Sequence, residues 1–167
     1  MKPRGAGEGQ TVAKWALALL FGVAVLAGAL MVFGKSLVLM SAMEGRLIDA
    51  DGRPAAGIRL VRSWDWAWRN LQGRDEASTD ENGAFRFPAV TGRSLTARLL
   101  PHEPSIRQRI IAHHASGTVE IWLARKGNYD DNGELRGRHL RVLCDLAGPP
   151  EDDQRLFASL CIEVADA

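Results

Sequence analysis

A long stretch without charged side chains, from Trp15 to Gly34, constrains this chain more than any other feature. Its twenty residues read WALALLFGVAVLAGALMVFG, with Lys14 before it and Lys35 after it. A bilayer core of about 30 Å needs roughly 20 apolar residues in a helix. A helix also satisfies every backbone N–H and C=O group of a single segment in lipid. The stretch therefore predicts a transmembrane helix.

This helix would divide the chain into a tail (1–14), an anchor (15–34), a linker (35–43) and a domain (44–167). Lysine and arginine do not set the orientation alone, because three lie on each side within twenty residues: Lys2, Arg4 and Lys14, against Lys35, Arg46 and Arg53. A short tail followed by a large domain favours a cytoplasmic N-terminus. We expect a single-pass inner-membrane protein of a Gram-negative-type cell, with its C-terminal domain in the periplasm.

A cleaved signal peptide is the alternative interpretation of the same stretch. Ala27-Gly28-Ala29 has the small-x-small pattern of a cleavage site. The apolar run continues past it through Leu30-Met31-Val32-Phe33, so a cleaved product would begin with exposed apolar side chains. This continuation favours an uncleaved anchor.

The composition after the anchor is that of one globular domain. Residues 36–167 hold 17 lysines and arginines and 19 aspartates and glutamates, distributed without a basic block. Nucleic-acid binding needs a basic face that neutralises phosphates. The composition therefore argues against a nucleic-acid partner.

Short strands separated by turns predict an all-β fold. The Asn82-Gly83 pair, with Phe85 and Phe87 alternating after it, is typical of a hairpin. Gln72–Glu76 and Asn128–Gly137 read as polar loops, and no stretch reads as an amphipathic helix. The predicted strands cover 45–48, 57–68, 77–79, 84–87, 95–100, 107–113, 118–123, 138–146 and 157–164. Many short strands that each bury one face indicate a single β-sandwich, of the prealbumin-like or Ig-like kind.

Two motifs carry a resemblance to a known domain type. The first runs from Gly45 to Leu60 and contains Asp49-Ala50-Asp51-Gly52-Arg53-Pro54; the second is Thr79-Asp80-Glu81-Asn82-Gly83-Ala84-Phe85. Together they resemble the carboxypeptidase-regulatory-like, transthyretin-like domains. The resemblance covers about 44–90 and implies a prealbumin-like sandwich that acts as a binding or spacer module.

Later pieces resemble a second, smaller family. They are Leu100-Pro101-His102-Glu103-Pro104 and the segment from Tyr129 through Asn132-Gly133-Glu134-Leu135. With the tryptophan-rich strand, they resemble a bacterial family of uncharacterised, membrane-anchored domains associated with type VI secretion genes. That resemblance brings no catalytic residues.

Cys144 and Cys161 are the only cysteines, and they lie symmetrically about Asp152-Asp153. In an antiparallel hairpin with that centre they would face each other at a distance near disulfide range. An oxidising compartment would favour the bond. We predict a disulfide, with two buried thiols as the alternative.

Trp64, Trp66 and Trp68 alternate with Asp65, Ala67 and Arg69. On a strand the three indoles would share one face. We predict that they form a binding platform, with Asp65 and Arg69 at its rim, because tryptophan is enriched at binding hot spots. Two alternatives remain open: the indoles cover the edge of the core or pack onto Trp122, or they rest at a membrane interface.

Metal and nucleophile motifs are weak or absent, and we expect no cofactor. His102-Glu103 and His113-His114 are adjacent pairs that point apart on an extended chain, so neither predicts a zinc site. Asn128–Gly133 resembles half of a calcium loop, but His139 stands where its glutamate belongs, which favours a plain turn. Neither G-x-S-x-G nor S-x-x-K occurs.

Our functional expectation is a non-enzymatic module that binds another protein at the membrane. One alternative is an immunity protein that neutralises a type VI secretion toxin acting in the periplasm. A second is an envelope hydrolase that uses carboxylates or His102 and Glu103. A structural spacer is a third.

Overall fold

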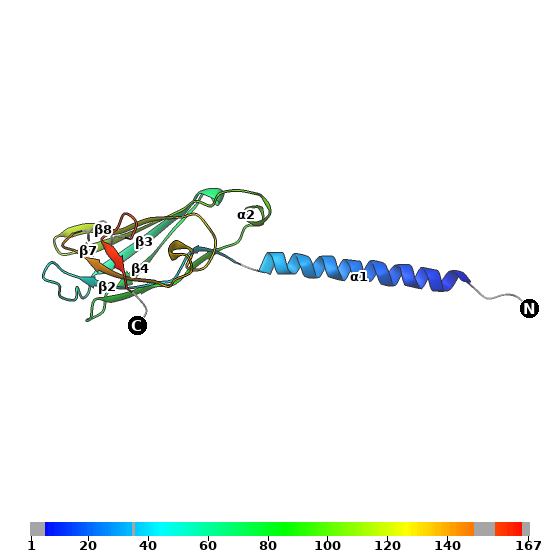
Figure 1. The fold of residues 1–167 in the computed structure, drawn as a ribbon, viewed down its shortest axis with the longest axis horizontal. Helices are drawn as coiled ribbons and strands as arrows, with labels where there is room; N and C mark the ends of the chain where they lie inside the picture. Colours follow the sequence, from blue (N-terminus) through cyan, green and yellow to red (C-terminus); the bar gives the residue numbers. More distant parts are fainter. Residues whose placement is uncertain (1–5, 35, 149–155, 165–167) are drawn as a thin grey trace, which may run out of the picture. The chain divides into compact units, whose positions relative to one another are not determined.

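A computed structural model describes residues 6–34, 36–148 and 156–164, with side chains of the N-terminal helix described for 14–28. The chain divides into two compact units, Met1–Ser36 and Leu37–Ala167. The first holds helix α1 (Ala6–Gly34) and the second holds every strand that the structure describes (Figure 1).

Helix α1 has no polar face among its described side chains. From residue 14 to residue 28 every side chain is exposed, and the apolar ones include Trp15, Leu19 and Phe21. Within the described part of the chain, no helix combines the length and apolarity that a membrane crossing requires.

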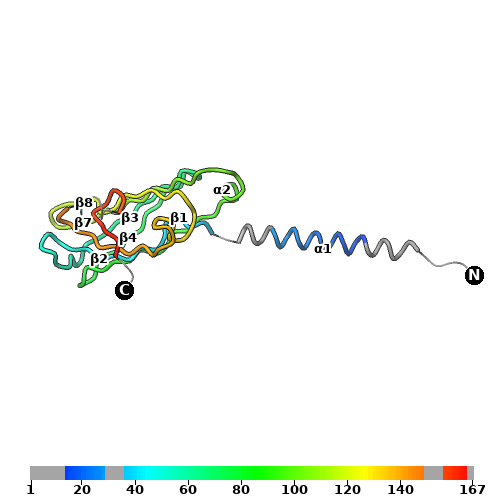
Figure 2. The backbone as a smooth tube through the Cα atoms, viewed as in Figure 1, coloured from blue at the N-terminus to red at the C-terminus, as the bar shows by residue number. Residues whose placement is uncertain are grey.

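The second unit is mostly β and its sheets form a sandwich-like arrangement, which confirms the expected all-β architecture at that level (Figures 1 and 2). One sheet has the order β10-β9-β2-β5, the other has the order β4-β3-β7-β8, and β1 pairs with β6. The first sheet is mixed, because β2 runs parallel to β9. The bounds are β1 Leu37–Met40, β2 Met43–Ile48, β3 Arg59–Trp66, η1 Ala67–Arg69, β4 Leu71–Ser78, β5 Ala84–Phe87, β6 Val90–Gly92, α2 Thr96–Leu99, β7 Ile106–His114, β8 Gly117–Lys126, η2 Gly133–Leu135, β9 Leu140–Asp145 and β10 Cys161–Glu163.

Alternation along the strands builds the core between the sheets. In β7 the buried side chains are Ile106, Gln108, Ile110 and Ala112, and the residues between them are more exposed. The larger cluster includes Leu47, Leu60, Phe87 and Trp122, and a second cluster surrounds Trp66. Burial of these apolar faces is the main force that holds the two sheets together.

The two aspartate motifs fold into two turns of the same type. In each, the carboxylate oxygen Oδ1 accepts N–H groups two and four residues later: Asp51 and Arg53 for Asp49, and Asn82 and Ala84 for Asp80. In each, the glycine at the fourth position adopts positive φ, +75° at Gly52 and +71° at Gly83. Such side-chain caps favour a turn over continued strand.

The predicted disulfide is confirmed. Cys161 stands directly opposite Cys144 in the antiparallel β10–β9 register, and the two sulfurs are bonded. Both residues are buried in the larger core cluster. The bond therefore fastens the short last strand to the sheet.

Four local predictions were wrong. Gln72–Glu76 lies in β4 and not in a loop, because alternating polar residues can form a charged edge strand. Residues 95–100 contain helix α2 and not a strand, since Ser94 Oγ accepts the N–H of Ala97 and turns the chain. The expected linker 35–43 contributes the buried strand β1.

The fourth concerns the expected Asn82-Gly83 hairpin. A turn is present, but β5 pairs with β2, while β4 pairs with β3 in the other sheet. The N–H of Leu47 donates to the carbonyl of Gly83 at 2.8 Å, which directs the turn onto β2. The turn therefore joins the two sheets.

The equivalent turns allow a matched test with Gly83→Ala and Gly52→Ala. Both replacements strain a positive φ, at about 1–2 kcal/mol. A Cβ at Gly83 would also lie 2.3 Å from the carbonyl oxygen of Leu47, whereas nothing lies within 4 Å of one at Gly52. We expect Gly83→Ala to lower the free energy of unfolding by about 1–3 kcal/mol more than Gly52→Ala. Urea denaturation of the full chain in detergent measures both, and equal losses would contradict the close approach.

Candidate functional site

The predicted tryptophan platform is not one surface in this structure. Trp66 is 0 % exposed and packs with Leu37, Leu39, Met40, Ala97 and Ile106. Its indole Nε1–H donates to the Tyr129 hydroxyl at 3.0 Å. Trp66 therefore belongs to the core, which was one of the alternatives left open, although its partners do not include Trp122.

The other two indoles have separate roles. Trp64 lies on the inner face of β3, and its ring covers Gly73 of the neighbouring strand. Trp68 lies beyond the end of β3, in η1, where its ring stacks on His102 at 4.0 Å between centroids. Asp65 faces the outer side of the sheet and Arg69 is exposed in η1.

His102 and Tyr129 complete a small polar chain beside Trp66. His102 Nδ1 lies 3.0 Å from the carbonyl oxygen of Leu100, which can only accept, so Nδ1 carries the proton in the neutral ring. Nε2 then accepts from the Tyr129 hydroxyl at 2.8 Å. Burial raises the pKa of Tyr129, against the smaller effect of the Trp66 donor. Glu103 is exposed next to this cluster.

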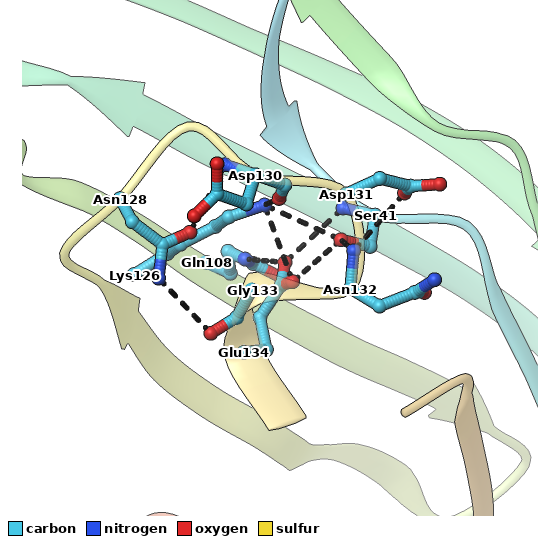
Figure 3. Close-up of polar contacts among 9 residues, drawn as sticks. All are labelled: Ser41, Gln108, Lys126, Asn128, Asp130, Asp131, Asn132, Gly133 and Glu134. Atoms are coloured by element: carbon cyan, nitrogen blue, oxygen red, sulfur yellow. Dashed lines mark hydrogen bonds and ion pairs between the residues drawn. The ribbon is translucent and has the colours of Figure 1, made fainter. Parts of the chain in front are cut away.

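A buried polar cluster that the sequence did not reveal lies beneath the loop that follows β8 (Figure 3). The side chains of Lys126 and Glu134 are both 0 % exposed, with Nζ and Oε2 3.3 Å apart. Lys126 Nζ also donates to Ser41 Oγ at 3.3 Å and to the Asp130 carbonyl at 2.6 Å. Three acceptors match the three protons of an ammonium group.

Glu134 is equally well supplied with donors. Its Oε1 accepts from Ser41 N at 3.1 Å and from Gln108 Nε2 at 2.8 Å, while Oε2 accepts from Ser41 Oγ at 2.5 Å. Burial acts to raise the pKa of Glu134, but these hydrogen bonds and the Lys126 charge outweigh it and lower that pKa. Burial lowers the pKa of Lys126, partly offset by Glu134. Both groups are held in place by complementary partners.

The cluster also explains the loop that resembled a calcium site. Asn128 Oδ1 accepts the N–H of Asp130, and Asn128 Nδ2 donates to the Gly133 carbonyl, as in an Asx-rich turn. Lys126 contacts the loop from within through the Asp130 carbonyl. Its ammonium supplies the positive charge that a metal ion would otherwise bring. Among the described residues, no three His, Cys, Asp or Glu side chains gather in a way that could hold a metal.

Sequence reasoning missed Ser41, Gln108, Lys126 and Glu134 as a set, although two of them carry a signal. Gln108 stands between Ile106 and Ile110 at an inward position of β7, and Lys126 follows Trp122 and Ala124 in β8. A polar residue on the apolar face of an alternating strand needs a buried partner. The sequence did not indicate which partner that would be.

The outer face of the β4-β3-β7-β8 sheet carries a candidate binding surface. A shallow groove of about 480 Å³ crosses it, and the residues that line it include Ser63, Asp65, Gln72, Arg74, Arg107, Arg109 and Leu123. We call this surface the arginine face. It includes Asp65, a predicted site residue, whose carboxylate accepts from Gln72 Nε2 at 3.3 Å.

The groove of the arginine face is lined by three arginines and by one acid, Asp65. Arg109 pairs with Glu120 at 2.6 Å. Arg74, Arg107 and Arg125 make no ion pair with any residue that the structure describes. Arg125 stands directly opposite Arg107 in the β7–β8 register. Like charges in that position destabilise a strand pair. Asp65 stands opposite Arg107 in the β3–β7 register and offsets part of this repulsion, and an anionic group of a partner would relieve the rest.

Comparison with known sequences places the chain in a family. Residues 43–149, well over half of the chain, match the family described as Domain of unknown function (DUF6795), and the chain belongs to it. No curated protein and no solved structure matches.

We predict that Glu134→Gln destabilises the fold strongly at neutral pH. The change removes a negative charge and leaves the buried Lys126 without its counterion. Removal of one partner from a buried ion pair costs about 3–5 kcal/mol. Thermal and urea unfolding of the full chain measure the loss, with exposed Glu81→Gln as the matched control. A loss equal to that of the control would contradict a structural role for the pair.

The same pair predicts a dependence of stability on pH. Because the folded pKa of Glu134 lies below its ordinary value of 4.5, the carboxylate stabilises the fold above that pH. This contribution disappears as the pH falls through the folded pKa. We therefore expect the free energy of unfolding, measured between neutral pH and strong acid, to fall more steeply below about pH 4.5 for the natural chain than for Glu134→Gln. Parallel curves would contradict the assignment.

Proposed function

We propose that this DUF6795 member is a membrane-tethered module of the periplasm that binds another protein through the arginine face and performs no catalysis of its own. The observation that carries the proposal is the direct opposition of Arg107 and Arg125. Neither guanidinium forms an ion pair with a described acid, although Asp65 stands opposite Arg107 in the β3–β7 register. Both can therefore bind a carboxylate of a partner. Arginine is enriched at protein interfaces because its planar fork binds carboxylates through two hydrogen bonds.

The placement of the reactive residue types favours binding over hydrolysis. Ser41, Lys126 and Glu134 would be attractive catalytic groups, but their side chains are buried and fully engaged with one another. His102 is held between Leu100, Tyr129 and Trp68. The arginine face, by contrast, presents charged groups on a rigid sheet, where little ordering entropy is lost on binding.

The proposed tether is the uncharged stretch 15–34. It lies in helix α1, and its described side chains are apolar on every side of the helix and exposed. A helix that is apolar all round needs an apolar environment, either a large protein core or lipid. The disulfide supports the periplasmic side, because disulfides persist in oxidising compartments.

The proposal also includes the type of β-sandwich to which the domain belongs. The paired turns at Asp49 and Asp80, with the same hydrogen bonds and the same glycine conformation, support a prealbumin-like sandwich. In such a module the turns define the sandwich ends and leave a sheet face free for contacts.

The test is a pull-down from the native membrane after crosslinking, with the double change Arg107→Glu and Arg125→Glu. Reversal of both charges should weaken capture of the partner at least tenfold, because truncation or reversal at a hot spot costs about 2 kcal/mol or more. Arg86→Glu is the matched control, since Arg86 is exposed on the outer face of the other sheet. A partner captured equally by all three chains would contradict the arginine face.

The identity of the captured protein separates the two kinds of partner. An envelope component would indicate a scaffold or adaptor, and a secreted toxin would indicate an immunity protein. Trp66→Ala is unsuitable as a binding variant, because loss of a buried tryptophan costs about 3–5 kcal/mol of stability.

A further inference from the structure

One end of the sandwich exposes a group of leucines. Outside α1, six large apolar side chains of the described residues are exposed, and four of them lie here: Leu71, Leu95, Leu99 and Leu100. Trp68 lies beside them. Its Nε1–H donates to Thr96 Oγ1, and its ring stacks on His102, which is hydrogen-bonded to the carbonyl oxygen of Leu100. We call this surface the leucine end.

Helix α2 orients the leucine end outward. Ala97 is buried in the core cluster around Trp66, while Leu95 and Leu99, four residues apart, share a side of the chain and are exposed. Leu99 is 66 % exposed and Leu100 is 53 % exposed. Adjacent exposed leucines on a short, well-packed segment mark a contact surface for something apolar.

The leucine end lies next to the point where the polypeptide enters the domain. Leu37, the first residue of β1, packs in the same cluster as Ala97. Leu37 follows Gly34, the last residue of the uncharged stretch, by only three positions. Three extended residues reach at most about 11 Å. If the stretch spans a bilayer, Leu37 and the leucine end beside it cannot lie far from the lipid surface.

The charges around the leucines fit a phospholipid surface. Arg69 and Arg93 are exposed, and Arg98 lies on α2 itself, while Glu103 is an exposed acid in the segment that follows α2. Arginine beside exposed leucine and tryptophan is the composition of interfacial segments, which insert apolar side chains and hold phosphates with their cations.

We propose that the leucine end docks on the outer surface of the membrane that anchors the chain, with Leu95, Leu99 and Leu100 in the headgroup and acyl boundary. The proposal rests on the tether proposed above. Docking at two points, the helix and the leucine end, would limit rotation of the domain about its short connection. The arginine face would then be presented at a defined angle to the bilayer.

The experiment uses the full chain with one introduced cysteine, labelled with the fluorophore NBD. The natural cysteines are bonded to each other, so only the new thiol reacts. Leu99→Cys reports on the leucine end. Ala115→Cys is the control. Ala115 is exposed in the turn after β7 and lies nine positions, or about 30 Å of extended strand, from Ile106. Both chains enter vesicles of phosphatidylethanolamine and phosphatidylglycerol that carry a nitroxide quencher on the lipid.

We expect NBD at position 99 to lose about half of its emission to the quencher, and NBD at position 115 to keep its emission. Adding Leu95→Ser and Leu100→Ser to the labelled chain should restore the emission at position 99. Flotation of the vesicles reports separately on the tether. A chain that floats but shows equal emission at both positions would overturn docking alone and leave the leucines free for a protein. A chain that does not float would overturn the tether and the docking together.

Discussion

The ion pair between Lys126 and Glu134 is the interaction on which the arrangement of this domain most depends. It is sealed from water and links the β1–β2 connection through Ser41, strand β7 through Gln108, and the loop that follows β8. A charge buried in this way is tolerated only when every donor and acceptor is matched. The cluster thus favours one relative position of these three segments and of β8, which carries Lys126, where apolar packing alone would accept several.

Local patterns in the sequence revealed much of the fold. Short runs between turns predicted β2, β7, β8 and β9, and the aspartate-glycine turns are present because a carboxylate and a positive φ act within five residues. The pairing of Cys144 with Cys161 followed from symmetry about a loop. Each of these features depends on neighbours in the chain or on a single hairpin. Hydrophobic periodicity and turn residues are therefore sufficient to predict them.

Features set by distant residues were not predictable. Ser41 and Glu134 are 93 residues apart, and nothing near either residue indicates the other. The tryptophans alternate as a surface stripe would, but their burial depends on Tyr129, Gly73 and the core around β1. The arginine face is likewise assembled from several strands, so its charge is dispersed along the sequence and visible only in the register.

The parallel pairing of β2 with β9 has a consequence for the order in which the domain can form. Met43 pairs with Leu140, so β2 is among the first strands of the domain to be synthesised, yet its partner on one side comes almost last. Contacts between residues so far apart in the sequence make folding slow, and apolar strands stay exposed until their partner strands are in place. Until β9 has been synthesised, the N-terminal half of the domain would therefore remain an incomplete sheet with the β9-facing edge of β2 unpaired.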